Sequence, residues 1–411
     1  MNSRDGSQRY VEELLRGLHA LVQEPANPWQ IDVHLGMRQI VTLQHVVENV
    51  LARPDQDIGN PSREQNKPAT GFLQNLSSRV FDTLLDLLPD GVVSGLQQWN
   101  RALQSFVWSR FKKIDFTQYD LVHLTLPQFY HTLADCNTRL LSSVFDLSHV
   151  HYPQFHMRNN IVCTEKGLQF AVANNASFVA ISEATRKDFL AHFPDFDGSR
   201  IHTIHCGRDA GAFRPITDTH ALQQVRDRYQ LPDRPFFLSL STLEPRKNLI
   251  NSIRAFLHFV QSNPELDVCL VIAGRTGWKF DDIFDAAQQH RERIVFTGFI
   301  ADEDLPAIYS SALALSYVSY YEGFGLPPLE AMSCGTPVIY GDNSSMPEVI
   351  DGAGLPAEPD DIEDIARQFK AMAGDTALRD TLSGAALAQA NKFSWETMAQ
   401  QTLAIYRQVA G

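Results

Sequence analysis

Short apolar runs alternate with amphipathic stretches through the second half of the chain. The apolar runs have the length of buried β-strands and lie at residues 236–241, 267–274, 293–299, 312–318 and from 337 to 340. Helical patterns lie between them, at residues 249–260 and 302–311. Because parallel strands need a crossover between them, this alternation predicts an α/β fold built on a parallel sheet.

The first half of the chain shows the same alternation less clearly. Its strand-like runs lie at residues 31–35, 119–124 and 140–145, and its helical patterns at residues 11–22 and 182–190. Ser182 is placed to cap the second of these helices, and Ser394 to cap a last helix that reaches residue 409. With 411 residues we expect two domains of roughly 200 residues each, with the break near residues 207–215.

Composition limits the class of protein. The net charge of −13 argues against binding to a nucleic-acid backbone. No apolar run approaches the roughly 18 residues of a membrane span, and no secretory signal opens the chain. The five cysteines, an odd number without metal-site spacing, indicate a reducing compartment, so we expect a cytoplasmic protein.

Two segments of the first half are expected at the surface. Residues 55–67 are polar and rich in turn residues, which predicts a mobile loop. Residues 103–113 interleave aromatic and basic side chains, a pattern that fits a peripheral contact with a membrane. The alternative for the second segment is an ordinary amphipathic helix with a solvated face.

The densest pattern is YEGFGLPPLEAMSCGTPVI, at residues 321–339. It predicts a strand, a glycine turn, a short helix, a second turn and a strand. Pro327 and Pro328 suit the first turn of the helix, and Gly335 suits a left-handed residue at its end. Such a unit directs backbone N–H groups and the positive end of the helix dipole into one crevice, which makes it an anion site.

Two carboxylates accompany this anion site. Glu322 falls in the glycine turn and Glu330 in the first helical turn. Ionised carboxylates only accept hydrogen bonds, so their natural partners are hydroxyl groups, such as those of a ribose or a hexose. A site with N–H groups that donate to a phosphate, beside carboxylates that accept from sugar hydroxyls, suits a nucleotide sugar. The alternative is a pair of solvated charges at the start of a helix.

A basic pair follows the run at 236–241. Arg246 and Lys247 lie where that strand turns into the next helix, at the carboxyl edge of the sheet, where open α/β sheets bind ligands. Two cations can stabilise a departing diphosphate without a metal ion. The alternative is a solvated pair on a loop. Asn248 is expected to cap the helix that follows.

The E-G-F-G-L-P-P-L-E-A-M segment at residues 322–332 and the E-P-R-K-N segment at residues 244–248 resemble the retaining GT-B glycosyltransferases of family four. The resemblance implies that Glu322 lies against the donor sugar, that Glu330 binds the ribose, and that Arg246 and Lys247 hold the diphosphate. It adds further candidates for donor contact: the backbone of Gly323, Phe324, Gly325 and Leu326, a nucleotide base on Phe299 and Ile300, and, more weakly, Arg275.

The resemblance extends from about residue 144 to the C-terminus and implies a whole architecture. Two Rossmann-like domains, 1–208 for the acceptor and 209–392 for the donor, would face each other across a cleft. A C-terminal helix, 393–411, would cross back onto the first domain. The activity implied is retaining, metal-independent transfer of a hexose from a nucleotide sugar to a glycan or lipid-linked acceptor. GDP-mannose is favoured as donor, and UDP-sugars come next.

The chain departs from the family pattern in two places. Phe145 stands where the family has a histidine before Asp146, and His149 or His151 would have to supply that group. The family's first strand is missing, so that Gly6 and the residues up to Arg9 would form the loop that faces the diphosphate. Two alternatives stay open: a catalytically silent partner-binding subunit, which these departures favour, and a GT-B phosphorylase or epimerase.

Overall fold

A computed structural model describes residues 6–23, 27–34, 40–51, 116–133, 137–275, 287 and 290–411. The chain divides into two compact units, one of residues 28–115 with residue 1, and one of residues 2–27 with 116–411. The segments predicted to form a mobile loop (55–67) and a membrane contact (103–113) lie outside the described residues.

The smaller unit contains a short antiparallel ribbon. Strand β1, Asp32–His34, pairs with β2, Ile40–Thr42, and is followed by α2, Leu43–His45, and the π-helical turn η1, Val46–Leu51. The run at residues 31–35 thus contains a strand, but this strand lies in a two-stranded antiparallel sheet and not in the parallel sheet of the first half. Polar residues alternate with apolar ones in β1, whereas strands of parallel sheets are buried on both faces.

The first sheet of the larger unit is parallel and four-stranded, in the order β3-β4-β5-β6. Its strands are β3 Leu121–Leu124, β4 Arg139–Val144, β5 Ser177–Ala180 and β6 Ile201–Thr203. The helices between them are η2 Pro127–Leu133, α5 Ser148–His151, η3 Pro153–Phe155, α6 Arg158–Ala173, α7 Glu183–His192 and η4 Gly198–Arg200. Ser182 caps α7 as predicted, because its side chain accepts a hydrogen bond from the Thr185 backbone N–H at 3.0 Å.

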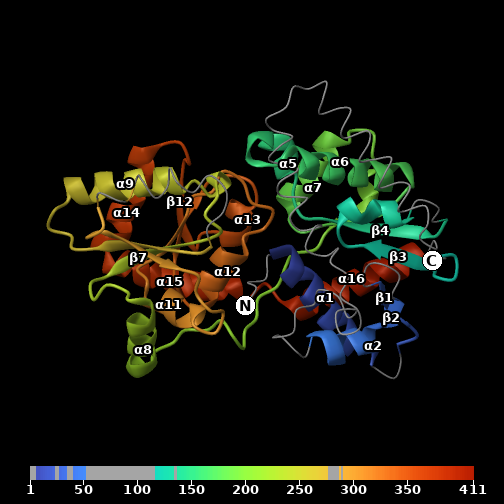
Figure 1. Ribbon diagram of the computed structural model, residues 1–411, viewed down its shortest axis with the longest axis horizontal. Coiled ribbons are helices and arrows are strands. Elements are labelled where there is room, and N and C mark those ends of the chain that lie inside the picture. The colour runs from blue at the N-terminus through green and yellow to red at the C-terminus, as the bar shows by residue number, and fades with distance from the viewer. Residues whose placement is uncertain are drawn as a thin grey trace, which may run out of the picture. The chain divides into compact units, whose positions relative to one another are not determined.

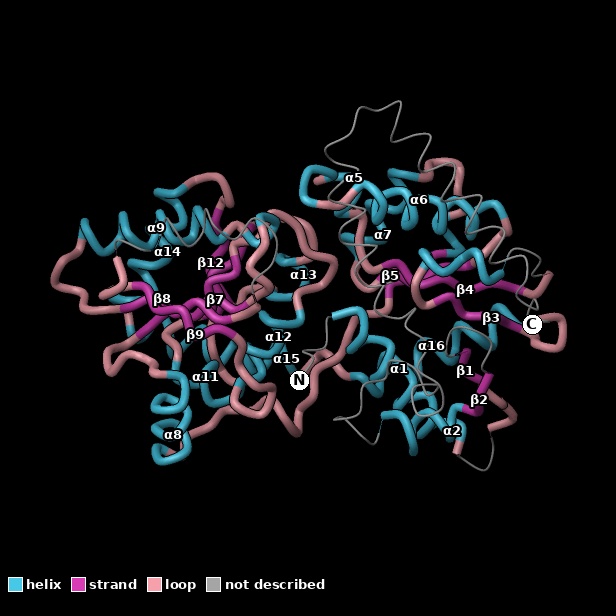
Figure 2. Tube along the Cα trace, viewed as in Figure 1, coloured by secondary structure: helices cyan, strands magenta, loops and turns pink. Residues whose placement is uncertain are grey.

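The second sheet is parallel and six-stranded, in the order β12-β11-β10-β7-β8-β9. Figure 2 shows its strands beside one another. They are β7 Phe236–Leu240, β8 Cys269–Ala273, β9 Ile294–Gly298, β10 Leu315–Tyr317, β11 Val338–Gly341 and β12 Gly354–Ala357. Each of the five runs predicted in this half coincides with one of these strands to within two residues at each end, except that the run at 312–318 begins three residues before β10. The chain runs outward from β7 in one direction and then returns to β10, so the order reverses between these two strands.

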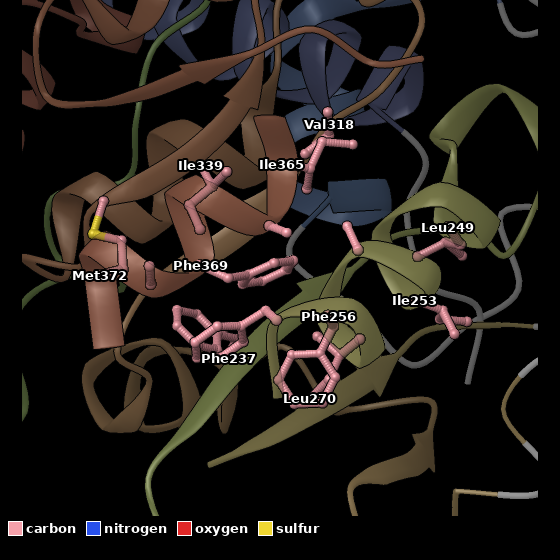
Figure 3. Close-up of a cluster of buried hydrophobic side chains, with 14 of the residues drawn as sticks. Phe237, Leu249, Ile253, Phe256, Leu270, Val318, Ile339, Ile365, Phe369 and Met372 are labelled. Carbon is pink, nitrogen blue, oxygen red and sulfur yellow. The ribbon is translucent and has the colours of Figure 1, made fainter. Parts of the chain in front are cut away.

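Helices pack around this sheet. They are α8 Thr219–Tyr229, α9 Leu249–Ser262, α11 Leu305–Ser311, α12 Leu326–Ser333, α13 Met346–Ile350, α14 Ile362–Gly374 and α15 Thr376–Ala390 (Figure 1). A buried aromatic cluster joins the strands to α9 and α14. Phe237 of β7 lies edge-on to Phe369 of α14 at 4.8 Å between ring centroids, and Phe256 of α9 lies edge-on to the same ring at 5.6 Å (Figure 3). These contacts fix the strand from which Arg246 and Lys247 follow.

The C-terminal helix, α16 Trp395–Ala410, begins at the predicted cap, where Ser394 accepts a hydrogen bond from the Thr397 backbone N–H at 3.3 Å. It packs on α1, Gly6–Val22, and on strands β3 and β4 of the first sheet. The implied return of this helix to the first domain is confirmed. Gly17 permits the close approach, because a Cβ at that position would lie 2.5 Å from the Cβ of Ala399.

One prediction about the N-terminus is wrong. Helix α1 begins at Gly6, so Gly6 to Arg9 form its first turn and not a loop. The place of a first strand is not tested, since residues 1–5 lie outside the described residues. The domain limits at 208 and 392 also remain predictions; residue 208 lies between β6 and β7. No helix in the described part of the chain has the length and apolar character needed to cross a bilayer.

Candidate functional site

Three candidate residues meet where the strand order of the second sheet reverses. Arg246 and Lys247 end the 3-10 turn η5, Pro245–Lys247, which follows β7, and Glu322 lies in the turn after the neighbouring strand β10. Lys247 Nζ is 2.6 Å from Glu322 Oε1, and Arg246 Nη1 is 3.3 Å from Glu322 Oε2. The structure thus brings three of the candidate residues together, and the sheet topology explains why they meet.

Further hydrogen bonds hold the two cations in place. Arg246 Nη1 donates to the Tyr321 carbonyl at 2.6 Å, and its Nη2 donates to Glu244 Oε1 at 2.9 Å. Lys247 Nζ donates to the Tyr317 hydroxyl at 2.9 Å. The guanidinium and the ammonium are thus preorganised, which reduces the entropy lost when an anion binds to them.

Burial and mutual attraction set the charges of the cluster. Burial alone would raise the pKa of Glu322, but Lys247 and Arg246 outweigh it and lower the pKa to about 2. Burial lowers the pKa of Lys247, and repulsion from Arg246 lowers it further, against the attraction of Glu322. Glu322 is therefore ionised at neutral pH and can only accept hydrogen bonds.

The glycine turn after Glu322 is shaped by close contacts with the first sheet. A Cβ on Gly323 would lie 2.0 Å from the carbonyl oxygen of Phe145, just beyond β4. Thr185 Oγ1, on α7, lies 3.3 Å from both the Phe145 and the Gly323 carbonyl oxygens. Gly325 has a φ of +102°, which a residue with a side chain rarely adopts. Both glycines are thus required for steric reasons.

Helix α12 starts as predicted, with prolines in its first turn and Gly335, at φ +76°, just beyond its end. Prolines carry no N–H, so the amide donors near its N-terminus belong to the turn and to Leu326. Glu330 is the fifth residue of the helix and opens its second turn, so its predicted place in the first turn is wrong. The two prolines indicate the first turn of the helix but not its first residue, which is Leu326, one position before Pro327.

Glu330 is buried and already engaged. The Arg9 guanidinium, from α1, forms an ion pair with its Oε1, and the Tyr309 hydroxyl donates to its Oε2 at 3.1 Å. Burial raises the pKa of Glu330, and the charge of Arg9 opposes that rise. Gly6 lies beside the start of α12, where its Cβ would be 3.7 Å from Leu326 Cδ1. The first turn of α1 and the N-terminal part of α12 therefore adjoin.

Asn248 does not cap α9, contrary to prediction. It occupies the position before the helix in a left-handed conformation, with φ +55°. Its carboxamide donates instead to the carbonyl oxygens of Val318, at 3.1 Å, and Pro359, at 2.7 Å. Asn248 thus ties the turn after β7 to the chain just beyond β10 and just beyond β12. The sequence gives no local signal for this long-range role.

The departures from the family pattern have a physical explanation. The Phe145 ring packs edge-on against Tyr10 at 5.0 Å between centroids, so an apolar contact fills the place of the family's histidine. Asp146 accepts hydrogen bonds from the backbone N–H and the hydroxyl of Ser148, at 2.9 and 2.6 Å. Its charge contributes to raising the pKa of Arg246, against the lowering effect of burial. Asp146 therefore belongs to the electrostatic surroundings of the cluster.

The two histidines proposed as substitutes have other partners. His149 is buried, and its Nε2 lies 3.5 Å from Glu165 Oε2, which also pairs with His192 at 3.0 Å. His151 stacks on the Tyr321 ring at 5.4 Å, with its Nε2 3.4 Å from Asp188 Oδ2. His149 is thus directed to α6 and α7, whereas His151 adjoins the residue before Glu322.

Phe299 and Ile300, the residues expected at the nucleotide base, lie after strand β9, and Arg275, the weaker candidate for contact with the donor, lies after β8. The Arg275 guanidinium lies over the Phe299 ring, 4.7 Å from its centroid. Phe299 is 37% exposed, whereas Ile300 is buried at 3%. Of the two apolar candidates, Phe299 is therefore the more accessible to a ligand, while Ile300 contributes to the interior.

Comparisons with known proteins agree with this geometry. Residues 223–388 match the family described as glycosyl transferases group 1. The chain is 32% identical over 287 residues to the O-antigen chain mannosyltransferase B of Escherichia coli, covering 68% of this chain and 73% of that one. It is 37% identical over 226 residues to the serotype-specific mannosyltransferase WbdA of Escherichia coli, covering 54% of this chain but only 27% of that longer relative.

Solved structures share the fold. Sucrose-phosphate synthase from Thermosynechococcus elongatus superposes with a TM-score of 0.64 at 22% identity, over 98% of this chain and 93% of that one. The Anabaena protein HepE, in complex with UDP and glucose, superposes with a TM-score of 0.59 at 20% identity, over 70% of this chain and 78% of that one. Two parallel Rossmann-like sheets and the returning helix α16 thus make a GT-B fold.

The chain belongs to the glycosyl transferases group 1 family. It is a glycosyltransferase, a hexosyltransferase that takes its sugar from a nucleotide-sugar donor. The family resemblance recognised in the sequence is confirmed.

Proposed function

We propose that this enzyme transfers mannose from GDP-mannose to a glycan or lipid-linked acceptor, with retention of anomeric configuration and without a metal ion. The observation that carries the proposal is the buried cluster of Arg246, Lys247 and Glu322 at the reversal point of the second sheet. The choice of mannose is supported by the mannosyltransferase names of the two Escherichia coli relatives.

The two cations would act on the leaving group. As the bond between sugar and diphosphate breaks, negative charge accumulates on the departing phosphate. Arg246 and Lys247 are held in place before the donor arrives, so they would stabilise this charge without reorganising. Amides of the turn and of Leu326 would add hydrogen bonds near the start of α12. Metal-free departure of the diphosphate then follows from groups already present.

The two carboxylates would bind hydroxyl groups. Glu322, ionised and held by Lys247, would accept hydrogen bonds from the transferred sugar. Glu330 would accept them from the ribose. A carboxylate offers about four lone-pair sites, so ribose hydroxyls can bind while Arg9 and Tyr309 remain in place. In this arrangement the charge of Arg9 opposes the rise in the pKa of Glu330 that burial causes.

Retention would follow a front-face path. The acceptor hydroxyl would attack from the side of the leaving group, and the departing phosphate would take its proton. This step gives the protein the tasks of positioning and electrostatic stabilisation, for which the cluster is built.

Thermal-shift measurements with GDP, UDP, ADP and their sugars, with and without EDTA, test the donor site. A ligand that binds only the folded state raises the melting temperature through mass action. We expect GDP and GDP-mannose to raise it by a few degrees at saturation, equally with EDTA, in the wild type and in Glu396→Ala, an exposed control on α16. Glu330→Ala should abolish the shift.

Each other outcome contradicts a defined part of the proposal. A shift with UDP-sugars alone would exclude GDP-mannose as donor. A shift that EDTA abolishes would exclude metal-independent binding. If no nucleotide shifts the melting temperature of the wild type, the site does not bind a nucleotide sugar.

A further inference from the structure

A third histidine lies near the cluster, in the same segment as His149 and His151. His156 follows η3, in an extended conformation with φ −123° and ψ 150°. Its Nε2 is buried, and within the described part of the chain no group forms a hydrogen bond with it. Buried polar atoms in folded proteins nearly always have partners, so an unpartnered one calls for an explanation.

Contacts of the same segment place His156 beside the donor site, because the adjacent Phe155 stacks on Tyr320 at 5.7 Å between ring centroids, and the Tyr320 backbone N–H donates to the Arg246 carbonyl oxygen at 3.0 Å. Burial lowers its pKa, Arg246 and His149 lower it further, and Asp146 and Glu244 oppose them. Arg246 and Glu244 are ion-paired with each other, and Arg246 also pairs with Glu322. Although His156 comes from the segment after β4, it therefore shares the electrostatic surroundings of the residues after β7 and β10.

A neutral imidazole suits a particular chemistry. With its pKa lowered, His156 is uncharged at pH 7, so one ring nitrogen donates a hydrogen bond and the other accepts one. A phosphate would gain little from such a group and would be repelled by the nearby Asp146. A hydroxyl group can both donate and accept, so it can satisfy the buried nitrogen in either tautomer.

We propose that His156 Nε2 binds a hydroxyl group of a sugar substrate, either of the transferred sugar or of the acceptor. This inference rests on the proposed function. Among the described residues His149 Nε2 also lacks a hydrogen bond, but it lies 3.5 Å from the Glu165 carboxylate, and His151 Nε2 lies 3.4 Å from that of Asp188. His156 forms no such ion pair with any described carboxylate. The histidine that the family places at position 145 is thus replaced by one eleven residues further along.

The substitution His156→Phe tests the proposal, because it keeps a ring of similar size and removes the nitrogens. A nitrogen that pairs only with substrate adds nothing to folding, so the melting temperature should stay equal or rise. The catalytic efficiency of mannose transfer should fall about tenfold. His156→Gln, whose amide nitrogen reaches about as far as Nε2, should recover part of the loss. His220→Gln, at an exposed position on α8, is the matched control.

Two further readouts identify which sugar is bound. If the hydroxyl belongs to the transferred sugar, His156→Phe should reduce the thermal shift with GDP-mannose but leave that with GDP unchanged. If it belongs to the acceptor, both shifts should stay unchanged while the KM for the acceptor rises. Either pattern supports the proposal.

Two results would overturn it. Wild-type efficiency in His156→Phe would show that the nitrogen contacts no substrate. A lower melting temperature together with no recovery in His156→Gln would show a structural role. Failure of the wild type itself to bind GDP or GDP-mannose would instead refute the proposed function, so the two failures can be told apart.

Discussion

At the scale of the residue, the cluster is defined by charges that are buried together. Glu322 is 7% exposed, yet it is ionised because two cations lie within bonding distance. Such groups are not placed for stability alone, since replacing buried ion pairs by apolar residues is often neutral or stabilising. Glu322 holds Arg246 and Lys247 in position before a ligand binds. A phosphate that binds these two cations would share them with the Glu322 carboxylate.

The low pKa of Glu322 predicts a specific dependence of stability on pH. A carboxylate with a pKa of about 4.5 unfolded and about 2 folded stabilises the protein above pH 4.5, and this contribution is lost as the pH falls through 2. The ionised Glu322 contributes about 3 kcal/mol to the free energy of unfolding above pH 4.5. Chemical unfolding at pH 5 and pH 3 should therefore show a smaller loss of stability in Glu322→Gln than in the wild type.

The control for this measurement is Glu363→Gln, at an exposed position in the first turn of α14. It should lose as much stability between pH 5 and pH 3 as the wild type. An equal loss in Glu322→Gln and the wild type would mean that Glu322 is not held ionised by its neighbours.

At the scale of the element, apolar runs predict the strands of the second sheet because each strand is buried on both faces. The start of α1 and the pairing of β1 are not predicted, since Gly6 and the polar residues of β1 carry no strong local signal. The same holds for Asn248 and for the pairing of Arg9 with Glu330. The positions of Arg246, Lys247 and Glu322 are predictable because strand ends fix them, whereas partners distant in sequence are not.

The Arg9–Glu330 pair joins α1 to α12 and can be measured by a double-mutant cycle. Removing either partner leaves the other buried charge uncompensated, so Arg9→Ala and Glu330→Ala should each destabilise the protein. The double variant should lose less free energy of unfolding than the two single variants lose together. The difference, which is the coupling free energy, should be about 1–3 kcal/mol when measured by urea unfolding.

The corresponding control cycle uses Arg367 and Asp364, a pair on the exposed side of α14 at 2.7 Å. Its coupling should be below about 1 kcal/mol. A coupling at Arg9 and Glu330 no larger than this would show that the pair does not join the two helices in solution.

At the scale of the whole molecule, α16 ties the end of the chain to the first sheet. The Tyr406 hydroxyl lies 2.7 Å from His123 Nδ1, and His123 Nε2 lies 2.9 Å from Ser143 Oγ. Burial lowers the pKa of His123 to about 4, so this buried network is neutral at pH 7. A neutral, hydrogen-bonded network adds specificity without the desolvation cost of a charge.

The contact of α1 with α16 predicts opposite effects for two similar substitutions. Gly17→Ala should destabilise the protein by about 1–3 kcal/mol, because the new Cβ would overlap Ala399. Gly384→Ala, within α15 and with no heavy atom within 4 Å of its Cβ, should stabilise it by about 0.5–1 kcal/mol. Thermal unfolding of both variants is sufficient, and a stabilising Gly17→Ala would contradict the close packing of the two helices.

The most direct test of the central claim is the rate at which GDP is released from GDP-mannose in the presence of a mannose-containing acceptor. Arg246→Ala should lower kcat by roughly 10²–10³, because a preorganised charge on the leaving group is lost. Arg254→Ala, at an exposed position on α9, is the control and should keep wild-type turnover. If folded Arg246→Ala also releases GDP at the wild-type rate, the cluster does not support the departure of the diphosphate.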